Sequence, residues 1–139
     1  MKAIMSIKPE YVQLIFEGKK KYEFRRTRLT YAVSEIMLYA TKPKGRIVGY
    51  IRTDKQISGT PERVWALTKN EAGVSRRDFF KYFGDCTTAY AYRISAVIVF
   101  SVQQSPSKDF TIPQSIRYAK PWEEDIFSDM ENQNDVILT

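Results

Sequence analysis

The spacing of hydrophobic and polar positions changes several times along the first hundred residues, which predicts a mixture of strands and short helices. The opening MKAIMSI alternates weakly and predicts a strand. KPEYVQLIFEGKK follows helical spacing, with Pro9 suited to the first turn and Gly18 to the position just past the end. KYEFRRTR returns to alternation, because Tyr22 and Phe24 alternate with Glu23 and Arg25. The chain is therefore predicted to begin with a strand, a helix and a second strand.

The middle of the chain continues this mixture. EIMLYAT and RIVGYIRTDKQI read as strands joined by a KPKG turn, so they predict a hairpin. Residues 58–73 predict a helix with Thr60 as its N-cap, and residues 74–84 a second helix that begins at Ser75 and stops at Gly84. The long alternating run TTAYAYRISAVIVFSVQQ is typical of a central strand.

The last third of the chain shows little periodicity. Residues 105–122 contain three prolines and predict an ordered loop that wraps the body, and residues 123–139 form an acidic end. The sum is a small α+β domain with about five or six mostly antiparallel strands and two or three short helices, arranged as a curled sheet or small open β-barrel. Residues 1–120 are predicted as the domain and residues 121–139 as an acidic end whose flexibility the sequence leaves open.

Charge divides the chain into two unlike parts. Residues 1–120 hold all 22 Lys and Arg against 10 Asp and Glu, whereas residues 121–139 hold 6 acids and no base. The formal net charge of +6 therefore averages a basic body with an acidic end. A body this basic attracts polyanions such as nucleic acid, although such a charge also serves solubility alone.

The composition removes several kinds of chemistry. The chain has no histidine and a single cysteine, Cys86, so His/Cys zinc sites, Ser-His-Asp triads and an internal disulfide are not expected. No P-loop or Gly-x-Gly-x-x-Gly pattern points to a nucleotide cofactor, and we predict no cofactor and no metal. No apolar run is long enough to span a bilayer and no signal peptide is evident, so we expect a cytoplasmic protein without a membrane partner.

The stretch GKKKYEFRR, residues 18–26, carries the first candidate site. On a strand Glu23 and Arg25 share a face, and Lys20 in the preceding turn can fold over them. A lysine held against other cations can have a lowered pKa, and a carboxylate beside it is then placed to act as a general base. The alternative is a solvated, salt-bridged strand, which spacing alone favours because such pairs are common at surfaces.

Two other groups are weaker candidates. Tyr39 and Thr41 end a strand where a loop begins, so they could line the mouth of a pocket, although a core tyrosine is the more usual reading. The loop PQSIRY collects several hydrogen-bonding side chains, and either a ligand or anchoring of the loop explains it. Aromatic residues could also stack on a base, but at these spacings they are more often core. The loop candidates are Gln114, Ser115, Arg117 and Tyr118, and the aromatic ones are Trp65, Tyr90 and Tyr92.

Together the segments SIKPEYVQLIFEGKKKYEFRR, YATKPKGRIVG, ISGTPERVW, DFFKYFG, AYAYRI and PQSIRY resemble the ASCH domain of the PUA-like superfamily, from about Met5 to Tyr118. The most specific part is the Gly-x-Lys-x-x-Glu-x-Arg element that begins at Gly18. The resemblance implies a small β-barrel flanked by helices, with a cleft that suits RNA or a modified nucleobase. It also implies two kinds of enzyme, amidohydrolases acting on N4-acetylcytidine and a ribonuclease branch.

The resemblance also assigns residues. The motif lysine of the amidohydrolases matches Lys20 and their motif arginine matches Arg25, but Glu23 stands where they place a threonine nucleophile. Within residues 20–26 the only hydroxyl belongs to Tyr22, so a hydrolase here would use Glu23 to activate water and Lys20 to stabilise the oxyanion. The expected ligand-binding residues are Lys8, Arg25, Tyr39, Thr41, Gln114, Ser115, Arg117 and Tyr118.

Three functions remain open from the sequence. The first is binding of RNA or a modified nucleoside in a basic cleft. The second is metal-independent hydrolysis of acylated nucleosides or RNA by Lys20 and Glu23. The third is a protein-interaction module that uses the acidic end, which could instead screen the cleft from RNA.

Overall fold

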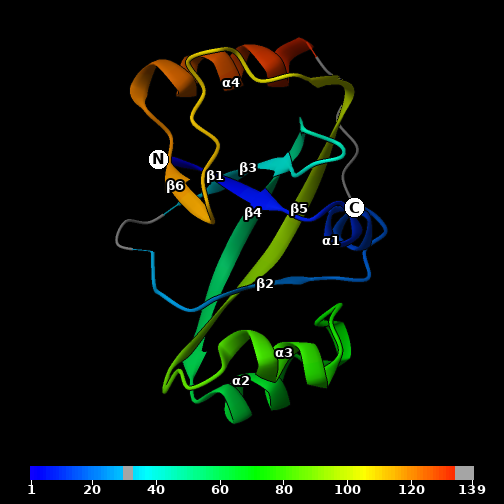
Figure 1. Cartoon of the computed structure of the whole chain (residues 1–139), viewed down its shortest axis with the longest axis vertical. Coiled ribbons are helices and arrows are strands. Elements are labelled where there is room, and N and C mark those ends of the chain that lie inside the picture. The colour runs from blue at the N-terminus through cyan, green and yellow to red at the C-terminus, as the bar shows by residue number, and fades with distance from the viewer. Residues whose placement is uncertain (30–32, 134–139) are drawn as a thin grey trace.

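One curled sheet crosses the molecule, with helices at both ends and along one side (Figure 1). The structure is a computed structural model that describes residues 1–29 and 33–133. In chain order the elements are β1 (Lys2–Ile7), α1 (Pro9–Phe16), β2 (Tyr22–Arg25), β3 (Glu35–Ala40), β4 (Arg46–Gly59), α2 (Pro61–Thr68), a 3-10 turn η1 (Lys69–Glu71), α3 (Arg76–Phe83), β5 (Ala89–Gln104), β6 (Ile116–Tyr118) and α4 (Pro121–Gln133).

The six strands of the described residues lie in the order β2-β5-β4-β3-β1-β6. Only β1 and β3 pair in parallel, and the other neighbours are antiparallel. The β4–β5 ladder shifts its register at several points, and such irregularities bend a sheet and increase its twist. The predicted α+β class with a curled, mostly antiparallel sheet is therefore confirmed.

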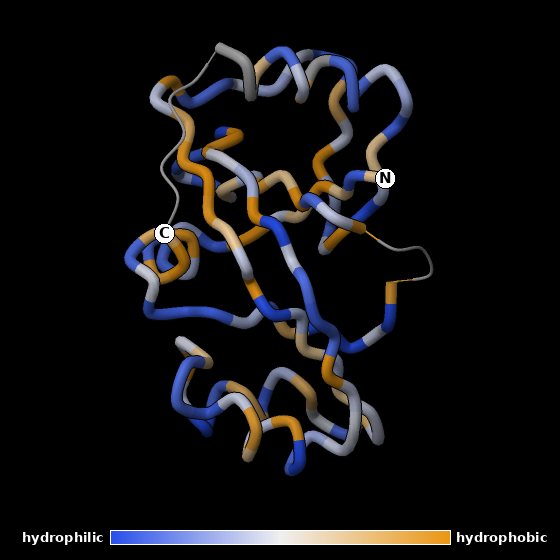
Figure 2. Tube along the Cα trace, turned by 180° about the vertical axis from the view of Figure 1, so that it is seen from behind, coloured by the Kyte–Doolittle hydropathy of each residue, from blue (hydrophilic) through white to orange (hydrophobic). Residues whose placement is uncertain are grey.

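Three groups of buried side chains hold the elements together. One lies between α1 and the sheet and includes Ile15 and Leu38, and a second lies under α4 and includes Phe127. The third joins β2 to α2 and α3 through Phe24 and Phe79. Figure 2 shows hydrophobic positions recurring along the central strands and hydrophilic runs between them. The third group matters most for function, because it fixes β2 against α3.

The caps of the middle helices agree with the sequence prediction. The Thr60 side chain accepts a hydrogen bond from the Arg63 N–H, and the Ser75 side chain accepts one from the Asp78 N–H. Helix α3 ends at Gly84, as expected, and Gly73 stands in the connection between η1 and α3. The two short helices were thus readable from their boundary residues.

Two elements differ from the prediction. The segment expected to be only a loop contains β6, which pairs with the edge of β1. The acidic end begins with α4, whose Phe127 and Met130 are buried against the sheet. Arg117 and Glu123 join these two elements through an ion pair of 2.7 Å. The described part of the acidic segment is therefore a packed fourth α-helix.

In residues 1–29 and 33–133, no helix has both the length and the apolar character needed to cross a bilayer.

Candidate functional site

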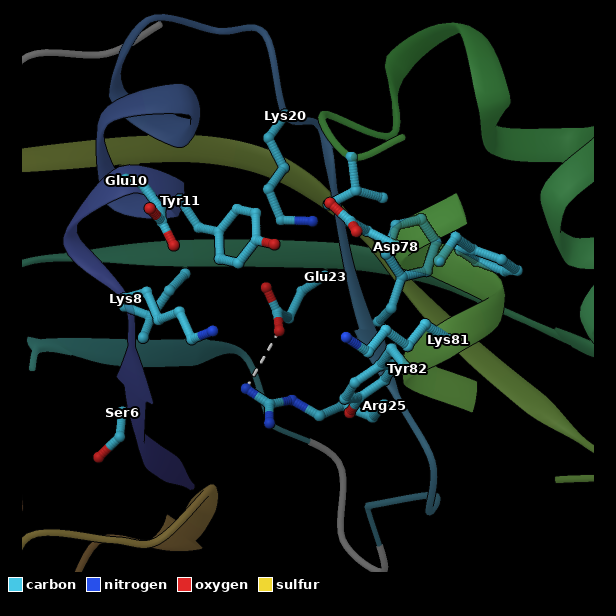
Figure 3. A pocket seen from close by; sticks show the side chains of 14 residues that line it. Ser6, Lys8, Glu10, Tyr11, Lys20, Glu23, Arg25, Asp78, Lys81 and Tyr82 are labelled. Atoms are coloured by element: carbon cyan, nitrogen blue, oxygen red, sulfur yellow. Dashed lines mark ion pairs between the residues drawn. The ribbon is translucent and has the colours of Figure 1, made fainter. Parts of the chain in front are cut away.

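A cavity of about 510 Å³ opens between α1, β2 and α3 (Figure 3). Its volume lies within the range of small-molecule sites, which is roughly 300–1,000 Å³. Three separate parts of the chain contribute: the end of β1 with α1, β2 with the turn before it, and α3 with Val74 shortly before it. The lining consists of Ser6, Ile7, Lys8, Glu10, Tyr11, Lys20, Glu23, Phe24, Arg25, Val74, Asp78, Phe79, Lys81 and Tyr82.

The strand β2 presents Glu23 and Arg25 to this cavity. The strand pairs with β5, and its alternation places these two charged side chains on the same face. Phe24 is held by an edge-to-face contact with Phe79, with 5.0 Å between ring centroids. This contact holds α3 against β2. The run Glu23–Phe24–Arg25 therefore supplies both the ring that packs against α3 and the two charged side chains of the cavity.

Lys20 lies in the turn between α1 and β2 and is only 5% exposed. Its ammonium donates a 3.2 Å hydrogen bond to the Ala72 carbonyl and lies 4.7 Å from the centre of the Phe24 ring. Burial lowers the pKa of Lys20 below its ordinary 10.5; the nearby Glu23 carboxylate opposes this shift, and Arg25 adds to it. The motif lysine is thus a desolvated amine beside a carboxylate.

Glu23 and Arg25 form a buried ion pair with unused hydrogen-bonding capacity. Arg25 Nη2 lies 3.1 Å from Glu23 Oε1, and Arg25 Nη1 donates to the Ser115 hydroxyl. Within the described part of the chain, Glu23 Oε2 and Arg25 Nε are buried without a hydrogen-bond partner. Buried polar atoms usually have partners, so an acceptor and a donor left free beside a cavity point to a ligand.

Two tyrosines flank the charged residues from opposite sides. Tyr11 comes from α1 and Tyr82 from α3. Burial raises the pKa of both phenols above 10.0; in Tyr11, the carboxylates of Asp78, Glu10 and Glu23 raise it further. Both hydroxyls therefore stay protonated near neutral pH and can donate hydrogen bonds. Their rings, with that of Phe24, offer flat surfaces for a planar ligand.

The predicted residues divide into those near the cavity and those away from it. Lys8, Lys20, Glu23 and Arg25 line it, and Ser115 reaches it through Arg25. Tyr39 is buried in the group under α4, with its ring 6.0 Å from Phe110. The others outside the lining are Thr41 after β3, exposed Gln114, and Arg117 and Tyr118 of β6.

The loop PQSIRY is tied to the body at several points. Ser115 accepts a hydrogen bond from the Ser6 backbone N–H, and the Ser6 hydroxyl donates to the Pro113 carbonyl. Arg117 makes two hydrogen bonds to the Glu123 carboxylate and lies over the Phe110 ring. Anchoring therefore accounts for Arg117, whereas Ser115 also orients Arg25.

The aromatic candidates lie outside the cavity lining. Trp65 packs on Phe79 with 5.0 Å between ring centroids, and the Tyr92 hydroxyl accepts a hydrogen bond from the Leu29 N–H. Tyr90 stands opposite Arg25 in the β2–β5 ladder. None of the three lines the cavity, so the stacking surfaces there come from other rings.

The wall supplied by α3 was missed from the sequence. Asp78 and Tyr82 are four residues apart and share a face of α3, and Lys81 lies beside them. A signal for this wall was present, since Phe79 and Phe83 mark the buried face of the helix and leave the polar face recognisable. The sequence did not show that this polar face of α3 lies across the cavity from α1 and β2. Tyr11 and Glu10 on α1 were missed for the same reason.

The curled sheet and the polar cavity beside its short edge strand define a PUA-like domain. The chain belongs to the ASCH domain family, whose model matches residues 5–117, so the resemblance seen in the sequence is confirmed. An ASCH domain-containing ribonuclease of Zymomonas mobilis subsp. mobilis is 32% identical over 91 residues, or 65% of this chain and 62% of that protein. The match thus spans less than two thirds of that relative's length.

Solved structures agree with the fold. The crystal structure of ASCH from Zymomonas mobilis has a TM-score of 0.81 and 26% identity, over 92% of this chain and 94% of that one. A tyrosine-to-phenylalanine mutant of the same protein gives a TM-score of 0.81 and 25% identity, over 92% of this chain and 96% of that one. The similarity extends beyond the family match to most of the described chain.

Proposed function

We propose that this chain binds single-stranded RNA and receives one unpaired base in the cavity between α1, β2 and α3. The observation that carries the proposal is the buried pair of free groups, the acceptor Glu23 Oε2 and the donor Arg25 Nε. An acceptor next to a donor matches the edge of a nucleobase, which presents both kinds of atom. Tyr11, Phe24 and Tyr82 supply rings on which a base can stack.

The charges of the cavity also favour a base over a bare phosphate chain. The lining holds four cations, Lys8, Lys20, Arg25 and Lys81, and three carboxylates, Glu10, Glu23 and Asp78. A nearly balanced set attracts a polyanion only weakly and suits a neutral ring with donors and acceptors. The amino groups of Lys8 and Lys81 are exposed, so they can meet the phosphates at the rim.

Substitution of Glu23 by glutamine tests base recognition. Glutamine keeps the shape but exchanges an acceptor oxygen for a donor amide, so we expect the dissociation constant for a short single-stranded RNA to rise about 5- to 100-fold. Fluorescence anisotropy with labelled oligonucleotides of each base measures it. Glu62→Gln on α2, an exposed carboxylate outside the cavity, is the matched control. Equal affinity of Glu23→Gln and the control contradicts the proposal.

A second candidate function is cleavage of the bound RNA, and the pairing of Lys20 with Glu23 favours it. The Glu23 carboxylate would take the proton of a ribose 2′-hydroxyl, whose oxygen attacks the adjacent phosphorus while the bond to the 5′-oxygen breaks. Lys20 would give its proton to the leaving 5′-oxygen, a step that its lowered pKa assists. The relative named a ribonuclease supports this direction.

The same variant separates binding from cleavage. If Glu23 also acts as the base, Glu23→Gln loses cleavage by about 100-fold or more even at RNA concentrations that saturate the variant, so the loss exceeds what weaker binding explains. Chromatography of a mixed RNA, and of N4-acetylcytidine in parallel, detects either product. Under the cleavage mechanism, RNA products end in a 2′,3′-cyclic phosphate and still form in EDTA. Absence of products in both reactions leaves binding as the function, and products that survive both Lys20→Ala and Glu23→Gln contradict this mechanism.

A further inference from the structure

Tyr82 connects the cavity to an exposed arginine that the cavity itself does not use. The ring of Tyr82 lines the cavity, and the guanidinium carbon of Arg26 lies 4.6 Å from the centre of the same ring. Arg26 directly follows Arg25, so these neighbours at the end of β2 differ sharply: Arg25 is buried and faces the cavity, while Arg26 is exposed. Arg25 thus lies inside the cavity and Arg26 outside it, and the Tyr82 side chain lies next to both positions.

Arg26 is held in place through only one of its nitrogens. Its Nε donates a 2.8 Å hydrogen bond to the Tyr82 carbonyl, which holds the guanidinium over the Tyr82 ring. Among the described residues, neither terminal nitrogen of Arg26 has a hydrogen bond or ion pair. An arginine fixed by its backbone contact loses less freedom when it binds, and its plane can stack while its terminal N–H groups bind phosphate.

We propose that Arg26, stacked on Tyr82, forms a second nucleotide subsite beside the cavity. The guanidinium plane stacks on the base that flanks the inserted one, and its terminal N–H groups donate to the phosphate between the two nucleotides. This inference rests on the proposed RNA binding and sharpens it. The ligand class becomes an RNA strand of at least two nucleotides, and a free nucleoside fills only half of the site.

The surroundings of Arg26 support a nucleic acid as the occupant. Lys81, one residue from Tyr82, is exposed, and Arg77 lies one helical turn before it on α3. Planar stacking beside exposed positive charge is the usual design for sequence-tolerant binding of single strands. A peptide of acidic residues could use the charge but has no aromatic ring to stack on the guanidinium.

The test compares ligands of different length on matched variants. Calorimetry measures affinity for a nucleoside, and anisotropy measures affinity for a ten-nucleotide single-stranded RNA at several salt concentrations. The variants are Arg26→Ala, Arg26→Lys and the control Arg63→Ala, which removes an exposed arginine of α2 outside the cavity. Thermal unfolding of each variant checks that the fold is retained.

Arg26→Ala is expected to weaken binding of the oligonucleotide about 5- to 50-fold and binding of the nucleoside less than about 2-fold. The slope of log affinity against log salt should become shallower by about 0.7. Arg26→Lys should recover the salt slope but only part of the affinity, because lysine restores charge without a stacking plane. If Arg26→Ala lowers the stability of the fold, the affinity of Arg26→Lys alone tests the subsite. An oligonucleotide affinity of Arg26→Lys equal to that of the wild type overturns the stacking subsite.

The failures of the two proposals are distinguishable. An oligonucleotide affinity of Arg26→Ala equal to that of Arg63→Ala, or an equal loss for both ligands, overturns the second subsite while RNA binding stands. A wild-type protein that binds no RNA overturns the proposed function and this inference with it. Tight binding of a polyglutamate peptide that Arg26→Ala abolishes, with no response to RNA, also overturns both.

Discussion

Lys20 is a buried amine for which the charged form is disfavoured by desolvation. Its ammonium makes one hydrogen bond to the Ala72 carbonyl and otherwise faces aromatic rings and the Glu23–Arg25 pair. Desolvation of a charge costs free energy that an ion pair only partly restores. A residue that weakens the fold yet lies in a cavity is typical of a functional site, where stability is given up for binding or reaction.

The lowered pKa of Lys20 gives a signed prediction about folding stability. At a pH below the pKa that Lys20 has in the folded protein, the lysine is protonated in the folded and the unfolded chain, and folding buries a cation. Between that pKa and 10.5, the unfolded chain holds more protons than the folded one. The free energy of unfolding therefore rises with pH over this range. At pH 7, Lys20→Met should therefore leave the free energy of unfolding unchanged or raise it by up to about 2 kcal/mol. RNA affinity should fall about 10-fold.

Urea unfolding of wild type and Lys20→Met at pH 7 and pH 10 measures this effect. The stability of the wild type relative to the variant should improve toward pH 10, because only the wild type gains from loss of the buried proton. Lys21→Met is the control: this neighbouring lysine is exposed and pairs with Glu71, so its loss should change stability by less than about 1 kcal/mol. A relative stability that falls with pH contradicts the desolvated lysine.

At the scale of single residues, one side of the site was predictable and the other was not. Alternation along the motif strand was enough to place Glu23 and Arg25 on one face, and the turn after Gly18 placed Lys20 near them. Tyr82 depends on the docking of α3 against Phe24, a contact between segments far apart in sequence. Spacing along a strand is local information, whereas the opposite wall of a cavity is set by tertiary packing.

At the scale of elements, the connection between η1 and α3 supports the motif turn. The Lys21 N–H donates a 2.9 Å hydrogen bond to the Glu71 carbonyl, and Lys20 binds the Ala72 carbonyl one residue further on. Gly73 has a φ of +68°, and a Cβ atom there would lie 2.4 Å from Lys20 Cβ and 2.7 Å from Lys20 Cα. The absence of a side chain at Gly73 thus allows the lysine to occupy its buried position.

Gly73→Ala should therefore harm both stability and the site. The positive φ alone costs about 1–2 kcal/mol, and the overlap with Lys20 should add about 1–3 kcal/mol. Gly18→Ala is the matched control, since Gly18 has a φ of +75° but nothing within 4 Å of the added Cβ. Urea unfolding and RNA anisotropy of the two variants give the comparison. Equal losses of stability and affinity would mean that the contact with Lys20 is unimportant.

The elements that sequence reasoning missed are those with the weakest local patterns. Strand β6 has three residues and is defined by its pairing with β1. Three residues are too few to show the alternation of hydrophobic and polar positions that predicts a strand. In α4, five of the thirteen residues are acidic, and among the described side chains Phe127 and Met130 mark the apolar buried face. Pro121 at the start and two glutamates in the first turn were nevertheless signals for a helix.

At the scale of the whole molecule, the acidic helix and the cavity occupy different regions. Helix α4 lies at one end of the sheet and α2 and α3 lie at the other (Figure 1). The start of α4 is fixed by the Arg117–Glu123 pair and by the Lys2 backbone N–H, which donates a 2.8 Å hydrogen bond to Glu124. No residue of the described helix lines the cavity, and residues 134–139 lie outside the described part of the chain. The arrangement argues against residues 121–133 as a competitor for bound RNA.

Neutralising the exposed acids of α4 should then have little effect on RNA binding. Asp125 and Asp129 are exposed, and charges separated by more than about 8 Å are largely screened at physiological salt. We expect the double variant Asp125→Asn, Asp129→Asn to change the affinity for single-stranded RNA by less than about 2-fold. Asp78→Asn removes one negative charge at the cavity itself and should tighten binding about 2- to 5-fold. Anisotropy at low and physiological salt gives both values. Substitution, unlike deletion of the segment, leaves the buried Phe127 in place. If the double variant gains more RNA affinity than Asp78→Asn does, the acidic helix opposes RNA binding and the prediction is wrong.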